Sequence, residues 1–444
     1  MTNRRKSREI EGQGNGKVRR FRRYSAYKDS GVEWLGEIPA AWDLRAVWTL
    51  FSLGRGRVIS HEEIHENQGP YPVYSSQTEN GGVMGNIATY DFDGDYLTWT
   101  TDGAKAGTVF VRSGKFNCTN VCGTLKARRS DQLDLRFVRD VLNVATTWFV
   151  RHDINPKLMN NVMARIRIQA PLRDEQRTIA AFLDRETARI DALAAKKERL
   201  IELLREKRAS LITRAVNKGL DPSVPMKDSG VEWLGKIPAH WEVRRLKFLL
   251  AAPLKYGANE AAELDDPDLP RYVRITDIDE NDGLREETFK SLPAEVATEY
   301  LLREGDLLFA RSGATAGKSF LYRPSWGVCA YAGYLIRARL NTVRICPAFI
   351  RYFASSSNYW QWLSATYIQA TIQNVSAERY ASLMVPQPSL REQRSVAAFL
   401  DLETARIDAL VAKVREAIDR LKELRIALIS AAVTGKIDVR GEVA

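Results

Sequence analysis

The sequence has few cysteines, only Cys118, Cys122, Cys329 and Cys346 in 444 residues. So few cysteines exclude a disulfide-rich secreted scaffold and favour reduced thiols inside the cell. The sequence also lacks the apolar run of about 18–20 residues that a membrane-spanning helix needs. Its basic N-terminus is not followed by an apolar stretch, which excludes a secretory signal. We therefore expect a cytoplasmic protein.

Motifs that would support catalysis are incomplete. HEEIH (61–65) has the H-E-x-x-H form of zinc proteases, but Gly69 and Pro70 interrupt the long helix that such a site needs. GATAGKS (313–319) has three residues between its glycines, whereas a Walker loop has four. The cysteines and histidines lack zinc-site spacing, and neither a Gly-x-Ser-x-Gly elbow nor an Asn-Pro-Pro-aromatic methyltransferase motif occurs. We expect no metal site and no enzymatic activity in this chain.

Positive charge, in contrast, is in excess. Lys and Arg number 66 against 55 Asp and Glu, which gives a net charge of +11. Such a charge is compatible with a nucleic-acid partner, because Lys and Arg neutralise phosphates without regard to sequence. Charge alone fits equally well a basic protein that binds no nucleic acid. Residues 1–27 are especially basic at their start, and we predict that they form a disordered arm.

Two blocks of the sequence occur twice. KDSGVEWLGEIPAAW at 28–42 returns as KDSGVEWLGKIPAHW at 227–241. EQRTIAAFLDRETARIDAL at 175–193 returns as EQRSVAAFLDLETARIDAL at 392–410. Such internal repeats determine the architecture before any local pattern is considered. The chain is therefore predicted to contain two copies of one unit, each made of the first block, a variable segment and a long helix.

The variable segments are only weakly alike. DGDYLTWTTDGAKAGTVF (93–110) faintly resembles EGDLLFARSGATAGKSF (304–320). Short stretches rich in Val, Ile, Thr, Tyr and Trp alternate there with Gly-rich turns, which is typical of mixed α and β structure. We predict an α+β fold with an internal pseudo-two-fold repeat, in which two long antiparallel helices join two α/β domains.

The second block has the period of a coiled coil, with apolar residues spaced alternately by three and four. The helices are predicted to start near Glu175 and Glu392 and to end near Gly219 and Gly435. About 42 residues give a rod of roughly 60 Å, which would hold two DNA-contacting domains apart. Alternatively, each stripe packs on its own domain. The predicted seam residues are Ile190, Leu193, Leu200, Leu204 and Leu211, interrupted by Lys197 and Lys207, and then Ile407, Leu410, Val414, Leu421, Leu424 and Leu428.

The doubled blocks resemble the specificity (S) subunit of type I restriction–modification systems. GVEWLGEIPAAW, the segment GPYPVYSSQTENGGVMG (69–85) and the SGATAGK-like turns are similar to that family as well. The resemblance implies a non-catalytic subunit that selects a bipartite double-stranded DNA site for two methyltransferase subunits and, in a larger assembly, for restriction (translocase) subunits. S-adenosylmethionine, ATP and Mg²⁺ are then expected on those partners, with no cofactor in this chain. The alternatives are a DNA-binding protein without a methyltransferase partner and a self-contained restriction–modification enzyme, which the missing motifs disfavour.

The resemblance also implies a division of the chain into domains, and it implies that DNA contacts come from the turns of the variable segments. The predicted parts are the arm (1–27), target recognition domain 1 (28–170), a central helix (171–222), target recognition domain 2 (223–387), a distal helix (388–437) and a tail (438–444). Polar and basic groups at Gly-rich or Ser/Thr-rich turns are the candidates for DNA contacts, although each also fits an ordinary solvated side chain. These candidates are Ser76, Gln77, Thr78, Lys105, Arg112, Arg311, Ser312, Thr315, Lys318, Gln369 and Gln373.

Overall fold

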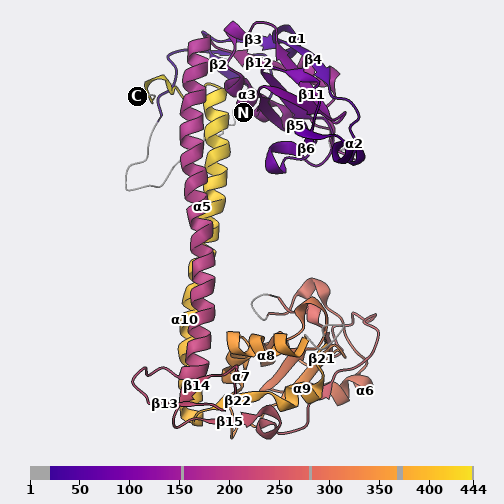
Figure 1. The fold of residues 1–444 in the computed structure, drawn as a ribbon, viewed down its shortest axis with the longest axis vertical. Coiled ribbons are helices and arrows are strands. Elements are labelled where there is room, and N and C mark those ends of the chain that lie inside the picture. Colours follow the sequence, from indigo (N-terminus) through magenta and orange to yellow (C-terminus); the bar gives the residue numbers. More distant parts are fainter. Residues whose placement is uncertain (1–20, 152–154, 280–282, 368–373, 443–444) are drawn as a thin grey trace, which may run out of the picture. The chain divides into compact units, whose positions relative to one another are not determined.

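The structure is a computed structural model that describes residues 21–151, 155–279, 283–367 and 374–442. The chain divides into two compact units (Figure 1). Unit 1 contains Met1–Lys197 and Glu416–Ala444, and unit 2 contains Glu198–Arg415. Within the described ranges, every helix is too short or too polar to span a membrane.

Unit 1 is built on an antiparallel sheet with strand order β4-β11-β8-β9. A second sheet has the order β6-β5-β10-β7, in which β5 and β10 run parallel. Helix α3 covers the first sheet, and its Phe137 and Val141 share a core with Trp99 and Leu125. The elements are β1 (Tyr27–Asp29), β2 (Glu37–Pro39), β3 (Asp43–Ala46), α1 (Val47–Leu50), β4 (Phe51–Arg55), α2 (His61–Glu66), β5 (Gln68–Tyr74), β6 (Val83–Ile87), β7 (Phe92–Asp93), β8 (Tyr96–Thr100), β9 (Val109–Arg112), β10 (Lys115–Cys118), β11 (Cys122–Ala127), α3 (Leu135–Ala145), η3 (Thr146–Trp148), α4 (Asn160–Arg165) and β12 (Arg167–Ala170).

Unit 2 repeats the first of these sheets in the order β16-β21-β18-β19. Its core joins Leu307 and Phe309 of the sheet with Phe349 of α7 and Tyr380 of α9. Strands β17 and β20 pair in parallel and form a separate two-stranded sheet. The elements are β13 (Met226–Asp228), β14 (Lys236–Pro238), β15 (Glu242–Arg245), β16 (Lys255–Tyr256), β17 (Arg271–Val273), α6 (Ala294–Ala297), β18 (Asp306–Ala310), β19 (Ser319–Leu321), β20 (Cys329–Tyr331), β21 (Leu335–Arg339), α7 (Pro347–Phe353), α8 (Ser357–Tyr367), α9 (Ala377–Ser382) and β22 (Met384–Gln387).

Two long helices, α5 (Arg173–Lys218) and α10 (Leu390–Val433), contribute to both units. Each begins two residues before its predicted start. In unit 1 the beginning of α5 packs on the end of α10, where Phe182 and Val433 share a core. In unit 2 the end of α5 packs on the beginning of α10, where Val216 and Leu400 share a core. The helices are therefore antiparallel in each unit, which confirms the predicted α+β fold with two long antiparallel helices.

One of the two rows of the predicted seam is buried, and the other is displaced by one residue. Ile407, Val414 and Leu428 of the predicted seam are buried, and so is Leu204. Leu193, Leu200 and Leu410, however, are 45%, 40% and 44% exposed, respectively. The residues that follow two of them, Ile201 and Val411, are only 8% and 9% exposed. Leu211 is half-buried, as are Ile190, Leu421 and Leu424.

This shift has a simple origin in the sequence. Positions three and four residues after a buried residue lie on the same side of a helix, so either can form the second row of a seam. Leu200 and Ile201 are both apolar, as are Leu410 and Val411. Hydrophobic spacing therefore cannot choose between the two rows, and the packing of the helices selects the later one.

The first repeated block, residues 28–42 and 227–241, is attached in each unit to the start of a long helix. Trp42 and Trp241 are buried, with 1% and 0% exposure. The indole N–H of Trp42 donates to the Glu175 carboxylate at 3.1 Å, and that of Trp241 donates to Glu392 at 2.9 Å. Both acceptors belong to the first turns of α5 and α10. The same tryptophan–glutamate contact is thus made once in each unit.

Part of the predicted basic arm is packed into unit 1. The Tyr24 hydroxyl donates to Glu175 at 2.8 Å, and burial raises the pKa of Tyr24. The Tyr27 hydroxyl donates to the carbonyl of Gly435 at 2.9 Å, and the Asp438 N–H donates to the carbonyl of Arg22 at 2.7 Å. The prediction of an arm up to residue 27 rested on charge and overlooked these aromatic side chains. Residues 1–20 of the predicted arm lie outside the described residues.

Candidate nucleic-acid interface

A glycine turn follows strand β8 in unit 1. The Gly107 N–H donates to the carbonyl of Thr100 at 2.8 Å, and the Thr108 N–H donates to that of Lys105 at 3.2 Å. Gly103 and Gly107 have φ angles of +95° and +86°, a region that side chains with a Cβ rarely enter. A Cβ on Gly107 would also lie only 2.9 Å from the Val150 side chain. The two glycines therefore allow a tight turn that packs closely on the residues following α3.

Side chains of both charges surround this turn. Asp102, just before Gly103, forms an isolated antiparallel bridge with Lys157, and their side chains are 3.6 Å apart. The Thr101 hydroxyl donates to Asp102 at 2.6 Å. Lys105 projects from the turn and is exposed, as is Trp148, which is 64% exposed. The turn thus brings an acid and two bases to one part of the surface of unit 1.

Unit 2 contains the same turn, built with different side chains. The Gly317 N–H donates to the carbonyl of Ala310 at 2.8 Å, and the Lys318 N–H donates to that of Thr315 at 3.0 Å. Gly313 and Gly317 have φ angles of +75° and +88°. The faint similarity of 93–110 to 304–320 therefore corresponds to one shared backbone structure.

The chain segment that pairs with each turn is also equivalent in the two units. The Leu158 N–H donates to the carbonyl of Thr101 at 2.9 Å, and the Val375 N–H donates to that of Arg311 at 2.9 Å. Just as Asp102 bridges to Lys157, Ser312 bridges to Asn374. The carbonyl of the last glycine is held in both units, by the hydroxyls of Thr146 at 2.8 Å and Tyr359 at 2.7 Å.

The second turn has a more strongly basic environment than the first. The Arg311 guanidinium lies 4.8 Å from the centre of the Tyr256 ring, and its Nε–H donates to the Asn374 side-chain oxygen at 3.4 Å. Lys318 is exposed at the end of the turn, whereas Ser312 and Thr315 are half-buried. Arg311 is therefore held by a ring and an amide and keeps other donor groups available.

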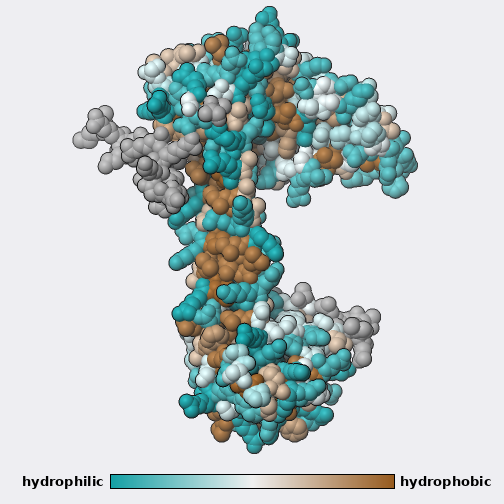
Figure 2. All heavy atoms as spheres, turned by 60° about the vertical axis from the view of Figure 1, so that its left-hand side comes forward, coloured by the Kyte–Doolittle hydropathy of each residue, from teal (hydrophilic) through white to brown (hydrophobic). Residues whose placement is uncertain are grey.

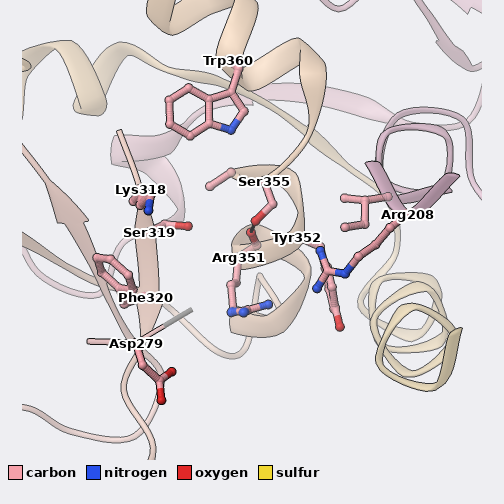
Figure 3. Close-up of a pocket in the computed structure, with 11 residues that line it drawn as sticks. Arg208, Asp279, Lys318, Ser319, Phe320, Arg351, Tyr352, Ser355 and Trp360 are labelled. Atoms are coloured by element: carbon pink, nitrogen blue, oxygen red, sulfur yellow. Dashed lines mark hydrogen bonds between the residues drawn. The ribbon is translucent and has the colours of Figure 1, made fainter. Parts of the chain in front are cut away.

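A cavity of about 220 Å³ lies behind this turn in unit 2 (Figure 3). Burial lowers the pKa of Arg351, one of its lining residues. Another, Arg208, is ion-paired with Asp408 at 3.1 Å. The wall is formed by Arg208, Ile212, Asp279, Lys318, Ser319, Phe320, Arg351, Tyr352, Ala354, Ser355 and Trp360. Basic groups thus outnumber the single acid in the wall.

The loop between β5 and β6 contains the candidates Ser76, Gln77 and Thr78. Gln77 is exposed, and its side-chain N–H donates to the carbonyl of Val83. Ser76 and Thr78 are half-buried. The loop is closed by a hydrogen bond of 2.9 Å from the Ser75 N–H to the Gly82 carbonyl. These side chains remain candidates, since the loop keeps them at the surface of unit 1.

Arg112 does not lie at the surface, in contrast to the other basic candidates. It is 7% exposed, its Nε–H donates to the Thr98 hydroxyl at 3.1 Å, and its guanidinium lies 3.6 Å from the centre of the Tyr74 ring. Burial lowers the pKa of Arg112. A Cβ on Gly82 would lie 3.1 Å from an Arg112 nitrogen. Arg112 therefore supports the Ser75–Gly82 loop from below, which its position near a turn in the sequence could not reveal.

The HEEIH motif and the Cys118–Cys122 pair are held by contacts within unit 1. HEEIH lies in the short helix α2, where Glu63 is ion-paired with Arg57 at 2.6 Å and the pKa of Glu63 is lowered by this hydrogen bond. Cys118 and Cys122 are buried and free, and the Cys122 thiol donates to the carbonyl of Tyr74 at 3.7 Å. Among the described residues, no group of three or more His, Cys, Asp or Glu side chains could hold a metal ion.

Sequence reasoning missed several residues of this surface, and two of its candidates cannot be placed. Gln369 and Gln373 lie outside the described residues. Asp102, Lys157, Asn374 and Tyr256 were not among the candidates. Asp102 could have been found, because the repeat aligns it with the candidate Ser312. The other three come from segments distant in the sequence, and no local pattern places them beside the turns.

Comparison with known proteins gives consistent matches. The family model described as "Type I restriction modification DNA specificity domain" matches residues 39–203. A putative type I specificity subunit N-terminus of Mycoplasma pneumoniae (S.MpnORF289P) is 46% identical over 131 residues, which are 29% of this chain and 70% of that protein. The type I restriction enzyme MpnII specificity subunit of the same organism is 43% identical over 131 residues, 29% of this chain but only 39% of its own length.

Solved structures show the same fold at low sequence identity. A chain from a structure titled "Structural basis underlying complex assembly and conformational transition of the type I R-M system" has a TM-score of 0.68 at 13% identity, covering 89% of this chain and 98% of that chain. The HsdS subunit of Thermoanaerobacter tengcongensis has a TM-score of 0.52 at 14% identity, covering 92% of this chain and 100% of that chain. These likenesses concern the fold alone.

Proposed function

The chain belongs to the family of type I restriction–modification specificity subunits, and we propose that it reads a bipartite DNA site, one half-site with each recognition domain. The observation that carries this proposal is the turn that occurs in both units with one backbone structure and different side chains. A shared backbone would place each turn on DNA in the same way. Different side chains would then make different contacts with base edges, so the two half-sites would differ.

The proposed DNA-contacting groups lie at the two turns and the β5–β6 loop. Lys105 and Lys318 are exposed cations suited to phosphate contacts, which position a protein on DNA without specifying sequence. Arg311, Ser312 and Thr315 in unit 2, and Ser76, Gln77 and Thr78 in unit 1, are suited to base edges or to the sugar-phosphate backbone. Gln369 and Gln373 stay in the proposal from sequence alone, whereas Arg112 is assigned the supporting role described above.

The chain supplies selection, and catalysis belongs to its proposed partners. We propose that methyltransferase subunits carrying S-adenosylmethionine dock on this chain, and that restriction subunits using ATP and Mg²⁺ join the larger assembly in the cytoplasm. Hydrophobic side chains gather on the surface of the long helices (Figure 2). In unit 2, Leu200, Leu203 and Leu410 are 40%, 46% and 44% exposed. Exposed apolar patches of this kind mark interaction surfaces, and we assign this one to a methyltransferase subunit.

The DNA-reading proposal is tested by sequencing methylated positions in DNA from cells that carry this chain with its methyltransferase subunit. The expected result is a split motif with two different halves separated by an unread spacer. Deletion of this chain should remove methylation at every copy of the motif. A symmetric, unsplit motif, or methylation that persists without the chain, contradicts the proposal.

The docking surface is tested separately with a Leu200→Glu, Leu410→Glu double variant. It should lose co-purification with the methyltransferase subunit, because two charges would replace apolar contacts. Arg205→Glu replaces a positive by a negative charge at another exposed position of α5, which changes net charge as much as the two leucine substitutions do, and it should leave co-purification intact. Equal loss in both variants would show that charge on the helices, rather than the leucine surface, governs docking.

A further inference from the structure

We infer that one bridge beside each glycine turn, Asp102 with Lys157 in unit 1 and Ser312 with Asn374 in unit 2, determines base preference in its recognition domain. This inference rests on the proposed DNA-reading function and identifies the residues that make the two half-sites different. Phosphate contacts from the neighbouring lysines would supply affinity, and the bridge residues would supply the choice of bases.

The equivalence of the two bridges is a property of the backbone. Each bridge lies next to a matching hydrogen bond, from Leu158 to Thr101 in unit 1 and from Val375 to Arg311 in unit 2, both of 2.9 Å. Each is followed by the same closed glycine turn. The side chains at the two bridges therefore project from closely similar backbones. Exchanging these side chains between the units changes their functional groups with little change in backbone geometry.

The chemistry at the two bridges differs in the way that base recognition requires. In unit 1 a carboxylate and an ammonium group lie 3.6 Å apart, and the Lys157 side chain is 51% exposed. A carboxylate accepts from the amino group of cytosine, and lysine donates to the O6 and N7 atoms of guanine. In unit 2 the bridge holds a hydroxyl and an exposed amide, the amide being also in contact with Arg311. Asparagine pairs with adenine, and arginine with guanine.

Other side chains around the turns are less suited to this choice. Thr101 is 1% exposed and its hydroxyl is already used by Asp102. Arg112 is buried beneath the β5–β6 loop. Lys105 and Lys318 are single flexible cations, which fit a phosphate more readily than they distinguish among bases. At the bridge, by contrast, the two units carry different groups on the same backbone, an acid and a base in unit 1 and a hydroxyl and an amide in unit 2.

Reciprocal exchange of the bridges provides the test. The first variant, Asp102→Ser with Lys157→Asn, gives unit 1 the side chains of unit 2. The second, Ser312→Asp with Asn374→Lys, does the reverse. Each exchange removes or adds one acid together with one base, so net charge and non-specific attraction to DNA stay constant. Because each new residue already occupies the same backbone position in the other unit, both variants should fold, which an unchanged melting temperature would verify.

The measurement is selection from double-stranded DNA libraries with the full chain, alone and with its methyltransferase subunit. Wild type is first selected on fully randomised DNA, and each half-site is then randomised in turn. The first exchange should change base preference by about 5- to 150-fold at one or two adjacent positions of one half-site, the range expected for a bidentate contact. The second exchange should alter the other half-site only. A control variant, Asp43→Ser with Arg45→Asn, replaces an exposed acid–base pair of unit 1 on β3 and should leave both half-sites unchanged.

Two outcomes would overturn the inference while leaving the DNA-reading proposal intact. One is wild-type selection of a split motif that neither exchange alters. The other is a uniform loss of affinity for all sequences, which would make the bridge residues backbone contacts. If wild type selects no split motif from the fully randomised library, both the inference and the proposed function fail. Lys105→Ala serves as a reference for the second outcome, because loss of a phosphate contact should weaken all sequences alike and lower the salt dependence.

Discussion

Replacing Glu175 by alanine should loosen the attachment of the recognition domain in unit 1. The Glu175 carboxylate accepts from the Trp42 indole at 3.1 Å and from the Tyr24 hydroxyl at 2.8 Å. The donors belong to residues that are 1% and 9% exposed, so neither can regain full hydration when the carboxylate is removed. An unpaired buried donor costs about 1–3 kcal/mol. Two such donors give about 2–4 kcal/mol, taking the lower part of the range because Tyr24 lies near the surface.

Hydrogen exchange of the full chain, followed by mass spectrometry of its peptides, measures this loss locally. Exchange of protected amides tracks the free energy of local opening, and about 1.4 kcal/mol corresponds to a factor of ten. Amides of β1 and β2, which pair through Tyr27–Pro39 and Asp29–Glu37, should therefore exchange about 30- to 700-fold faster. Peptides of unit 2 should be unchanged, since Trp241 has its own acceptor in Glu392.

Two matched variants separate the hydrogen bonds from other effects of the change. Glu175→Gln keeps an acceptor oxygen and loses only the charge, so its effect should be tenfold or less. Asp174→Ala removes an acid from the same helix turn, but its side chain is 96% exposed, so β1 and β2 should be unaffected. The reasoning fails if glutamine is as damaging as alanine, or if protection is lost equally in both units.

Three further predictions concern the helices, acid stability and the cysteines. Ile201→Ala should destabilise unit 2 by about 2–4 kcal/mol in urea unfolding, whereas Leu200→Ala should change stability by less than about 1 kcal/mol; equal effects would restore the predicted seam row. The hydrogen bond from Arg440 holds the pKa of Asp438 below its ordinary 3.8. Asp438→Asn should therefore have a lower melting temperature than wild type above pH 3.8, and this difference should vanish as pH falls through the depressed pKa. A difference that persists at low pH would exclude this ion pair as its cause. Alkylation of the native protein should modify half-buried Cys346 before Cys329, because burial raises the pKa of Cys329 to about 12. In denaturant, as the control, the two thiols should be alkylated at equal rates. Comparable alkylation rates in the native protein would contradict the burial of Cys329.

The architecture could be predicted from the sequence because it is encoded twice. The repeated blocks are long, nearly identical and strongly periodic, so the helices were placed within two residues of their starts at Arg173 and Leu390. A block that recurs beside divergent segments also indicates that it attaches those segments to the helices and does not itself select DNA sequence. The burial of Trp42 and Trp241 agrees with this. Features that depend on repetition were thus accessible without a structure, and so were the two long helices, although hydrophobic period left the second row of their seam undecided.

Features that depend on which face a residue presents were not accessible in the same way. Arg112 is the last residue of strand β9 and precedes a turn, yet its side chain is buried beneath Tyr74. Asp102 and Lys157 meet across a bridge between segments far apart in the sequence. Charge marked residues 22–27 as an arm, although Tyr24 and Tyr27 hold them against unit 1. In each case the outcome depends on tertiary contacts between segments that are separate in the sequence.

The two copies also differ in how one face of the long helices is covered. Phe182 of α5 is fully buried, since Phe21 packs on it with ring centres 5.7 Å apart, and Arg185 covers it while donating to the carbonyl of Glu442 at 2.8 Å. The repeat places Phe399 at the same position of α10, where it is 36% exposed, and puts Leu402 in place of arginine. In unit 1 two separate segments reach this helix face, one around Phe21 and one around Glu442, and the arginine binds one of them. In unit 2 a single continuous linker, 219–225, occupies the corresponding place in the chain. Leu402 is 52% exposed, so unit 2 has an apolar helix face at the position that unit 1 keeps covered.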